Sequence, residues 1–320
     1  MLRSILSATV AFGILALPAW AQNYPSGPVH LVVAYAAGGT GDVVARIVAP
    51  KLSTALGQTV IVENRAGASG ALGARSVATA APDGLTLLLG QTAEVAVNQH
   101  WVKGLGYDPD KDLQPVALLT VVPLALVVPA KAPYSTMAEL LAALRDSKLT
   151  FASAGAGTPG YFAGEWLKAK TKSNLTHVPY KGAGPALNDL IGGHVDLYFP
   201  GMPAAVPLVK NGLVKVLAVS SAKRSGIAPD VPAVAESAGF KDFDFTLWQG
   251  IFAPRGTPQP VVALLNSEIN KVLSDPETRQ KLVEAGADVE TMSLEQFHAF
   301  VGAESSKYLR VIKETGVTAE

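Results

Sequence analysis

Runs of hydrophobic residues alternate with amphipathic segments along most of the chain. Three runs with the aliphatic and β-branched content of buried strands lie at residues 29–35, 59–64 and 85–90. Between the first two, four aliphatic residues recur at every fourth position and share one helix face: Val44, Val48, Leu52 and Leu56. Gly57 follows and suits the helix end. This order of strands and helices predicts βαβ units and a mainly parallel sheet.

A second block repeats the same order. Its predicted strands lie at residues 149–154, 175–180, 195–199 and 213–221, and its predicted helices at 136–146, 158–170 and 183–193. Segments at 115–128 and 243–252 join the blocks, and the chain ends in helices, two of which begin at Asp275 and Ser293. We predict an α/β fold with two lobes around a cleft, a mainly parallel sheet in each lobe and two crossing strands as hinge. We expect lobe 1 to comprise residues 22–122 and 249–320, and lobe 2 residues 123–248.

The first 21 residues have the pattern of a secretory signal peptide. Arg3 precedes an apolar run over residues 5–17, and Ala19, Trp20 and Ala21 supply an AxA cleavage pattern. We expect cleavage after Ala21 and export of the mature chain to the periplasm. The later apolar run over residues 115–130 contains Pro123 and is too short to span a bilayer.

Composition and charge exclude several function classes. A hydrophobic content of 49% excludes a disordered chain, and 26 basic residues balance 26 acidic ones, which argues against nucleic acid as a partner. The chain has no cysteine, so it has neither a thiol nucleophile nor a thiolate metal site. The five histidines lack metal-ligand spacing. We expect no cofactor and no metal.

Two glycine loops stand where predicted strands give way to helices, at residues 36–42 and 153–160. Glycines let backbone N–H groups approach an anion, and a helix N-terminus adds partial positive charge. We expect Asp42 to cap the first helix, and Thr158 the second, with Pro159 in its first position. Neither loop contains lysine or arginine, which suits a carboxylate that must later be released. The alternative is an ordinary tight turn.

Two enzymatic interpretations fit the residues less well. Gly155, Gly157 and Gly160 spell GxGxxG, but a dinucleotide site needs an acidic residue after the next strand, where the chain has Tyr180 and Lys181. The segment "GASGA" around Ser69 faintly resembles a nucleophile elbow without a convincing histidine partner.

Ordered motifs over the whole predicted mature chain resemble a known family. They include "YPSGPVHLVVAYAAGGTGDVVAR", "LSTALGQTVIVENRAGASGALGA", "APDGLTLLLG", "LTFASAGAGT", "HVPYKGAGPALNDLIGGHVDLYF" and "LWQGIFAPRGTPQPVVALLNSEINKVLSDPETRQKLVEAGADV". On these segments the chain resembles the periplasmic substrate-binding proteins of the tripartite tricarboxylate transporter family, the Bug-type proteins.

The resemblance implies a Venus-flytrap fold that closes on a small carboxylic acid and delivers it to a membrane permease. It implies a monomer without catalytic activity, in which the two glycine loops grip one ligand carboxylate. The candidate ligand-binding residues, from the loops and from the resemblance, are Tyr35, Ala37, Gly38, Gly39, Thr40, Gly41, Asp42, Gln91, Thr92, Ser153, Ala154, Gly155, Ala156, Gly157, Thr158, Tyr161, Tyr180, Pro200 and Trp248.

Three departures from the family pattern bear on the ligand. Pro200 stands where many members have an aspartate, Tyr161 where many have a histidine, and Glu94 where a small residue is common. Without the aspartate, we expect a dicarboxylate or an aromatic carboxylate before an amino acid, and we expect Glu94 to be solvated. A sensor that docks on a membrane receptor kinase is the alternative function, since it too needs only a liganded closed state. An enzyme acting on the carboxylate is a weaker one.

Overall fold

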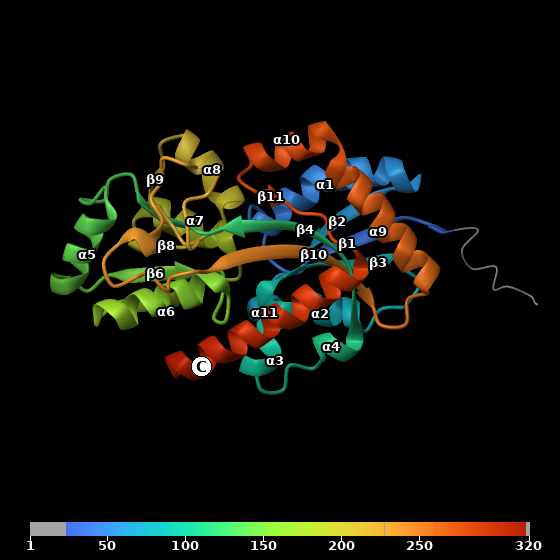
Figure 1. Ribbon diagram of the computed structural model, residues 1–320, viewed down its shortest axis with the longest axis horizontal. Coiled ribbons are helices and arrows are strands. Elements are labelled where there is room, and N and C mark those ends of the chain that lie inside the picture. Colours follow the sequence, from blue (N-terminus) through green and yellow to red (C-terminus); the bar gives the residue numbers. More distant parts are fainter. Residues whose placement is uncertain (1–23, 227, 318–320) are drawn as a thin grey trace, which may run out of the picture.

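The protein consists of two lobes, each built on its own β-sheet (Figure 1). The computed structural model describes residues 24–226 and 228–317. The predicted signal peptide, residues 1–21, lies outside this range. Within it, no helix has the length and hydrophobicity needed to cross a bilayer.

The first lobe has a six-stranded sheet in the order β11-β4-β10-β3-β1-β2. The strands are β1 (Val29–Val33), β2 (Val60–Asn64), β3 (Thr86–Gln91), β4 (Leu113–Pro123), β10 (Thr246–Pro254) and β11 (Asp288–Val289). The helices are α1 (Thr40–Leu56), α2 (Ala71–Ala78), α3 (Asn98–Trp101), α4 (Pro109–Asp112), α9 (Gln259–Ser274), α10 (Pro276–Glu284) and α11 (Leu294–Thr315). The last of these, α11, runs along the lower side of the molecule toward the second lobe (Figure 1).

The second lobe has a five-stranded sheet in the order β7-β6-β8-β5-β9. The strands are β5 (Ala125–Pro129), β6 (Thr150–Ser153), β7 (Thr176–Pro179), β8 (Leu197–Tyr198) and β9 (Val214–Val219). The helices are α5 (Met137–Asp146), α6 (Pro159–Thr171), α7 (Ala183–Gly192) and α8 (Met202–Lys210). The sequence analysis did not predict α8. Pro203 lies in its first turn, where proline is tolerated, but Pro207 lies in its interior, where proline argues against a helix.

Both sheets are mixed, which corrects the expectation of mainly parallel sheets. The parallel pairs are β1 with β2 and β3, and β6 with β7 and β8. The strands near the lobe junction pair antiparallel: β10 with β3 and β4, and β5 with β8 and β9. The βαβ blocks were therefore predicted correctly. Among the strands that connect the lobes, β10 runs opposite to its neighbours in the first sheet and β5 runs opposite to its neighbours in the second.

Helix caps follow the sequence closely. The apolar face of α1 is buried, and Gly57 ends the helix in the left-handed conformation with φ of 68°. Thr158 caps α6 with Pro159 in the first turn, and Asp275 caps α10. Ser293 and Gln296 form a capping box at α11.

Buried Ser220 joins the chain segments that pass between the lobes. Its backbone N–H donates to the Leu124 carbonyl, between β4 and β5, and its carbonyl accepts from the Phe245 N–H just before β10. The Ser220 hydroxyl accepts a hydrogen bond from the Leu124 N–H at 2.9 Å and donates to the Phe245 carbonyl. One fully buried side chain thus ties both crossings together.

We predict that Ser220→Ala lowers the free energy of unfolding by about 1–3 kcal/mol, because the buried Leu124 N–H loses its acceptor. Urea unfolding followed by circular dichroism measures this loss. Ser221→Ala is the matched control, since its hydroxyl is exposed and donates to the Lys223 carbonyl; its effect should stay within about 0.5 kcal/mol. Equal effects of the two substitutions would show that Ser220 does not hold the hinge.

Candidate functional site

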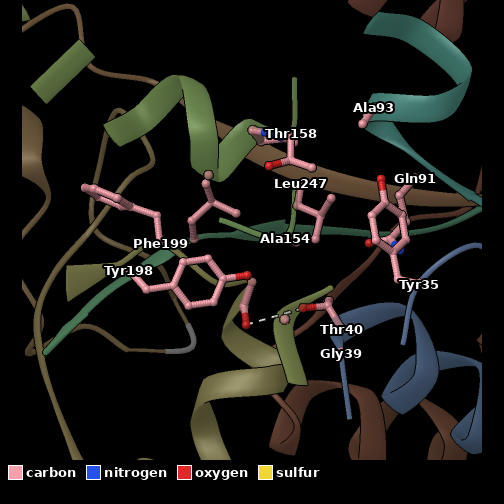
Figure 2. A pocket seen from close by; sticks show the side chains of 15 residues that line it. Tyr35, Gly39, Thr40, Gln91, Ala93, Ala154, Thr158, Tyr198, Phe199 and Leu247 are labelled. Carbon is pink, nitrogen blue, oxygen red and sulfur yellow. Dashed lines mark hydrogen bonds between the residues drawn. The ribbon is translucent and has the colours of Figure 1, made fainter. Parts of the chain in front are cut away.

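A cavity lies between the lobes, where the loops after β1, β3, β6 and β8 meet (Figure 2). Its volume is about 40 Å³, which is small, because one water molecule needs about 10–15 Å³ on this scale. The lining residues are Tyr35, Gly39, Thr40, Gln91, Ala93, Leu124, Ala154, Thr158, Pro159, Gly160, Ala183, Tyr198, Phe199, Gly201 and Leu247.

Four helices begin at this cavity. The lining includes first-turn or N-cap residues of α1 (Thr40), α6 (Thr158), α7 (Ala183) and α8 (Gly201). The N-caps of α1, α7 and α8 are glycines without a side-chain capping bond, so the N–H groups of the first helical residues, Thr40, Ala183 and Met202, keep their donor capacity. The partial positive charges of four helix ends therefore converge on one small volume.

The side chains that line the cavity are neutral, and two have free polar groups. Among the described residues, neither the Gln91 amide nor the Tyr198 hydroxyl has a hydrogen-bond partner, although both residues are buried. Burial raises the pKa of the Tyr198 phenol well above its usual range, so it stays protonated and can donate. Figure 2 shows Tyr35 and Tyr198 approaching the cavity from opposite sides.

The first glycine loop, residues 36–42, is held from within its own lobe. Gly38 has φ of +78°, and its N–H donates to the Asp42 carboxylate at 3.0 Å. Burial disfavours ionisation of Asp42, but hydrogen bonds from Arg46 and from the Gly38 N–H outweigh it and lower the Asp42 pKa. The expectation that Asp42 caps α1 is wrong: the N-cap is Gly39, without a side-chain capping bond, and Asp42 lies in the first turn, where its carboxylate holds the loop through the Gly38 N–H.

The second glycine loop, residues 153–158, is braced by His177. The Ser153 hydroxyl lies 2.7 Å from the His177 Nε2 and accepts from the Gly155 N–H. Burial, reinforced by the charge of Lys168, lowers the pKa of His177 to about 4, so the ring is neutral at pH 7. At the end of the loop, the Thr158 hydroxyl accepts from the Tyr161 N–H and donates to the Gly155 carbonyl. These bonds fix the loop that faces lobe 1.

The lobes touch around the cavity, so the conformation is closed. The Ala36 N–H donates to the Lys181 carbonyl at 3.4 Å, and the Thr40 hydroxyl donates to the Gly201 carbonyl at 3.4 Å. Gly184 on α7 lies so near the Ala37 carbonyl that a Cβ there would fall under 3.0 Å from its oxygen.

Aromatic rings also meet across the cleft. Trp101 at the end of α3 packs edge-on against Tyr161 and Phe162 of α6, with ring centroids 5.7 and 5.6 Å apart. Trp101 is therefore buried by the contact between the lobes.

Glu94 is fully buried, which corrects the expectation that it would be solvated. It lies in the short π-helical segment Ala93–Val97, after β3. Its Oε1 accepts from the Gln91 N–H at 2.7 Å, and its Oε2 lies 2.9 Å from the Tyr35 hydroxyl. Burial raises the pKa of Glu94 to about 8, although these hydrogen bonds lower it in part, so the carboxyl is mostly protonated at pH 7.

The structure brings part of the predicted site into the cavity wall. Six of the predicted residues line it: Tyr35, Gly39, Thr40, Gln91, Ala154 and Thr158. A second group is not in the lining but belongs to the same loops or packs next to them: Ala37, Gly38, Gly41, Asp42, Thr92, Ser153, Gly155, Ala156, Gly157 and Tyr161.

Three predicted residues are outside the cavity lining and are held by other partners, although Pro200 stands between the lining residues Phe199 and Gly201. Trp248 is fully buried in the core of lobe 1, where it packs against Phe300 and donates from Nε1 to Glu304. The Tyr180 hydroxyl donates to Asp189 on α7, and Pro200 uses its carbonyl to accept from the Ala125 N–H of β5. In each case a local partner within the same lobe holds the residue.

Sequence reasoning missed several lining residues as individuals. Tyr198 is the last residue of β8, and Phe199 and Gly201 lie between β8 and α8. Only their position in the sequence could have pointed to them, because a short strand ends there and a helix begins. Leu247 at the start of β10 has no such signal, since nothing separates it from other core leucines in sequence.

Known proteins share this fold and sequence. The family TctC, described as "Tripartite tricarboxylate transporter family receptor", matches residues 44–317. The protein BugT of Bordetella pertussis (strain Tohama I) is 34% identical over 318 residues, which cover 98% of this chain and 97% of BugT.

Solved structures of periplasmic binding proteins have the same fold. The periplasmic binding protein BugD and R. palustris Rpa4515 with adipate are each 34% identical, with a TM-score of 0.89 over 93% of this chain and 100% of theirs. MatC (Rpa3494) from Rhodopseudomonas palustris with bound malate is 36% identical, with a TM-score of 0.84 over 90% of this chain and 100% of its own. The chain belongs to the tripartite tricarboxylate transporter receptor family, the TctC or Bug-type periplasmic binding proteins.

Proposed function

We propose that this protein binds a small carboxylic acid between its lobes in the periplasm and delivers it, as a monomer, to the permease of a tripartite tricarboxylate transporter. The observation that carries the proposal is the convergence of four helix N-termini on a cavity without a charged side chain among its lining residues. Such a site favours an anion through backbone N–H groups.

The strength of this interaction suits a transported ligand. A helix N-terminus adds at most about 2 kcal/mol to the binding of an anion in a partly buried site. Four such ends supply at most about 8 kcal/mol, so by themselves they hold a ligand no more tightly than a dissociation constant of about 1 μM. A lysine or arginine in the cavity would add an ion pair and slow release.

The lining favours a short dicarboxylate over an amino acid or an aromatic acid. Pro200 is not an acidic acceptor, so nothing at that position pairs with a ligand ammonium group. The free Gln91 amide and Tyr198 hydroxyl suit a second carboxylate or a hydroxyl group. The related structures with adipate and malate support an aliphatic diacid.

Binding rather than catalysis is the proposed activity. Ser153 is fully buried and its hydroxyl is engaged by His177 and the Gly155 N–H, so it is not presented to a ligand. Closure of the lobes on the ligand would then create the surface that the permease recognises.

The ligand class is tested by a thermal-shift screen of the mature protein against dicarboxylates, tricarboxylates, aromatic acids, amino acids and NAD. A ligand at 100 times its dissociation constant adds about 2.7 kcal/mol to stability, which raises Tm by several degrees. We expect malate or adipate to give the largest shift. A shift with NAD, and none with any carboxylate, would exclude the transport function.

Closure itself is tested by Gly184→Ala. The added Cβ would overlap the Ala37 carbonyl across the cleft, whereas alanine suits this helical position within lobe 2. Overpacking costs about 1–3 kcal/mol, so we expect Kd for the best acid in the screen to rise about 5- to 150-fold. Ligand-induced quenching or enhancement of Trp101 fluorescence should weaken in parallel.

Gly302→Ala is the matched control for this substitution, since Gly302 is also helical and a Cβ there meets no atom within 4 Å. Its Kd should equal that of the unmodified protein. If Gly184→Ala binds as tightly as Gly302→Ala, then the ligand does not require the closed contact between α7 and the first glycine loop.

A further inference from the structure

Glu94, the buried carboxyl behind the cavity wall, lies outside the machinery described so far. Its side chain is 0% exposed and touches two hydrogen-bond partners, the Gln91 N–H and the Tyr35 hydroxyl. Both partners belong to residues that line the cavity. A Cβ at Gly70 would lie 2.8 Å from the Glu94 Oε2, so the carboxyl occupies space that only a glycine at position 70 leaves open.

The hydrogen bonds that the Tyr35 hydroxyl can make depend on whether Glu94 is protonated. The Tyr35 oxygen lies between two groups, the Glu94 Oε2 at 2.9 Å and the Ser69 carbonyl at 3.2 Å. A carbonyl only accepts, and a phenol has one proton. If Glu94 is protonated, it donates to Tyr35 and Tyr35 donates to Ser69, so both bonds form. If Glu94 is ionised, the single phenol proton goes to the carboxylate, and Ser69 loses this donor.

The Ser69 loop is strained and lies against lobe 2. Ala68 and Ser69 have φ of 47° and 49°, which costs about 1 kcal/mol or more for each non-glycine residue. The Tyr35 hydroxyl and the Asn98 side-chain amide hold it through the Ser69 carbonyl. Across the cleft lies Gly155, where a Cβ would come within 2.6 Å of the Ser69 hydroxyl oxygen. The loop is therefore one of the surfaces on which the second glycine loop closes.

No charged group offsets an ionised Glu94. The titratable groups that face it are the phenols of Tyr35 and Tyr107, the latter donating to the Glu94 backbone carbonyl. Burial raises the pKa of both phenols well above the usual range, so both are neutral. In the described part of the chain, no lysine, arginine or histidine contributes to the Glu94 environment.

We propose that Glu94 is a positioning residue that acts through Tyr35, and that the protein binds its anionic ligand tightly only while Glu94 carries a proton. The proton completes the chain from Glu94 through Tyr35 to the Ser69 loop, and its loss places an unpaired negative charge behind the cavity. The inference rests on the proposed function, because it needs an anionic ligand in this cavity.

The test compares the unmodified protein with Glu94→Gln by isothermal titration of malate and of adipate from pH 6.5 to 9.5. Glutamine donates to Tyr35 and accepts from the Gln91 N–H, but it does not titrate. Both acids are dianions throughout this range. We expect the Kd of the unmodified protein to rise about tenfold per pH unit above about pH 8, as expected for one coupled proton. The Kd of Glu94→Gln should stay within about threefold of the pH 6.5 value at every pH.

A second variant, Tyr35→Phe, keeps the ring and cuts the chain of hydrogen bonds. We expect its Kd at pH 6.5 to be about 5- to 10-fold higher than that of the unmodified protein, the effect of one buried hydrogen bond. If the unmodified protein shows no pH dependence, or if Glu94→Gln shows the same slope, the role of Glu94 is refuted while the carboxylate function stands.

A ligand-free measurement separates the two proposals if neither acid binds. The folded protein holds the Glu94 proton up to about pH 8, whereas an unfolded glutamate releases it near 4.5. Stability from this group is therefore present at low pH and lost as pH rises toward 8. We expect Tm of the unmodified protein to fall relative to Glu94→Gln between pH 5 and 8. If the Tm of both proteins changes with pH in parallel, the protonated state of buried Glu94 is refuted. If no acid binds, only the proposed function is refuted.

Discussion

The candidate site depends on one arrangement: the N-termini of four helices meet at one small cavity that is lined by neutral side chains. Free N–H groups at a helix N-terminus need acceptors, and glycine N-caps at α1, α7 and α8 supply none from their side chains. Two of the three lie in lobe 2 and one in lobe 1, with α6 of lobe 2 beside them. Under the proposed function, an anion between the lobes would satisfy donors from both sides and so stabilise the closed form over an open one.

Glycine makes this closed form possible at the places where backbones meet. Gly184 admits the Ala37 carbonyl, Gly182 admits the Ala36 backbone nitrogen, and Gly155 admits Ser69. Away from these contacts, Ser220 joins the crossing segments and α11 extends along both lobes (Figure 1). The lobes are therefore linked firmly at the hinge and only by close, reversible packing at the cleft.

Sequence reasoning predicted most of this fold and part of the site. Strand and helix positions followed from hydrophobic period and capping residues, because those signals are local. The direction of the strands at the lobe junction could not be predicted, because β4, β5 and β10 are aliphatic strands whichever way they run in the sheet. Gly39 and Thr158 were found because loop chemistry is visible in sequence. Trp248 was misplaced because an aromatic in a hydrophobic strand suits a core as well as a cavity.

Glu94 shows why the rest of the site could not be predicted from the sequence. A glutamate after a strand is usually solvated. Its burial depends on Tyr35, 59 residues earlier, and on close packing against Gly70. Such a site is defined by tertiary contacts between segments that share no local pattern, and the free amide of Gln91 and hydroxyl of Tyr198 belong to the same class.

Amide chemical shifts test the central claim most directly. In a ¹H–¹⁵N titration with malate, the account predicts the largest shifts at backbone N–H groups of helix starts that line the cavity, namely Thr40, Gly160, Ala183 and Gly201. Shifts confined to cationic surface segments, such as the groove that contains Arg255 and His298, would contradict it.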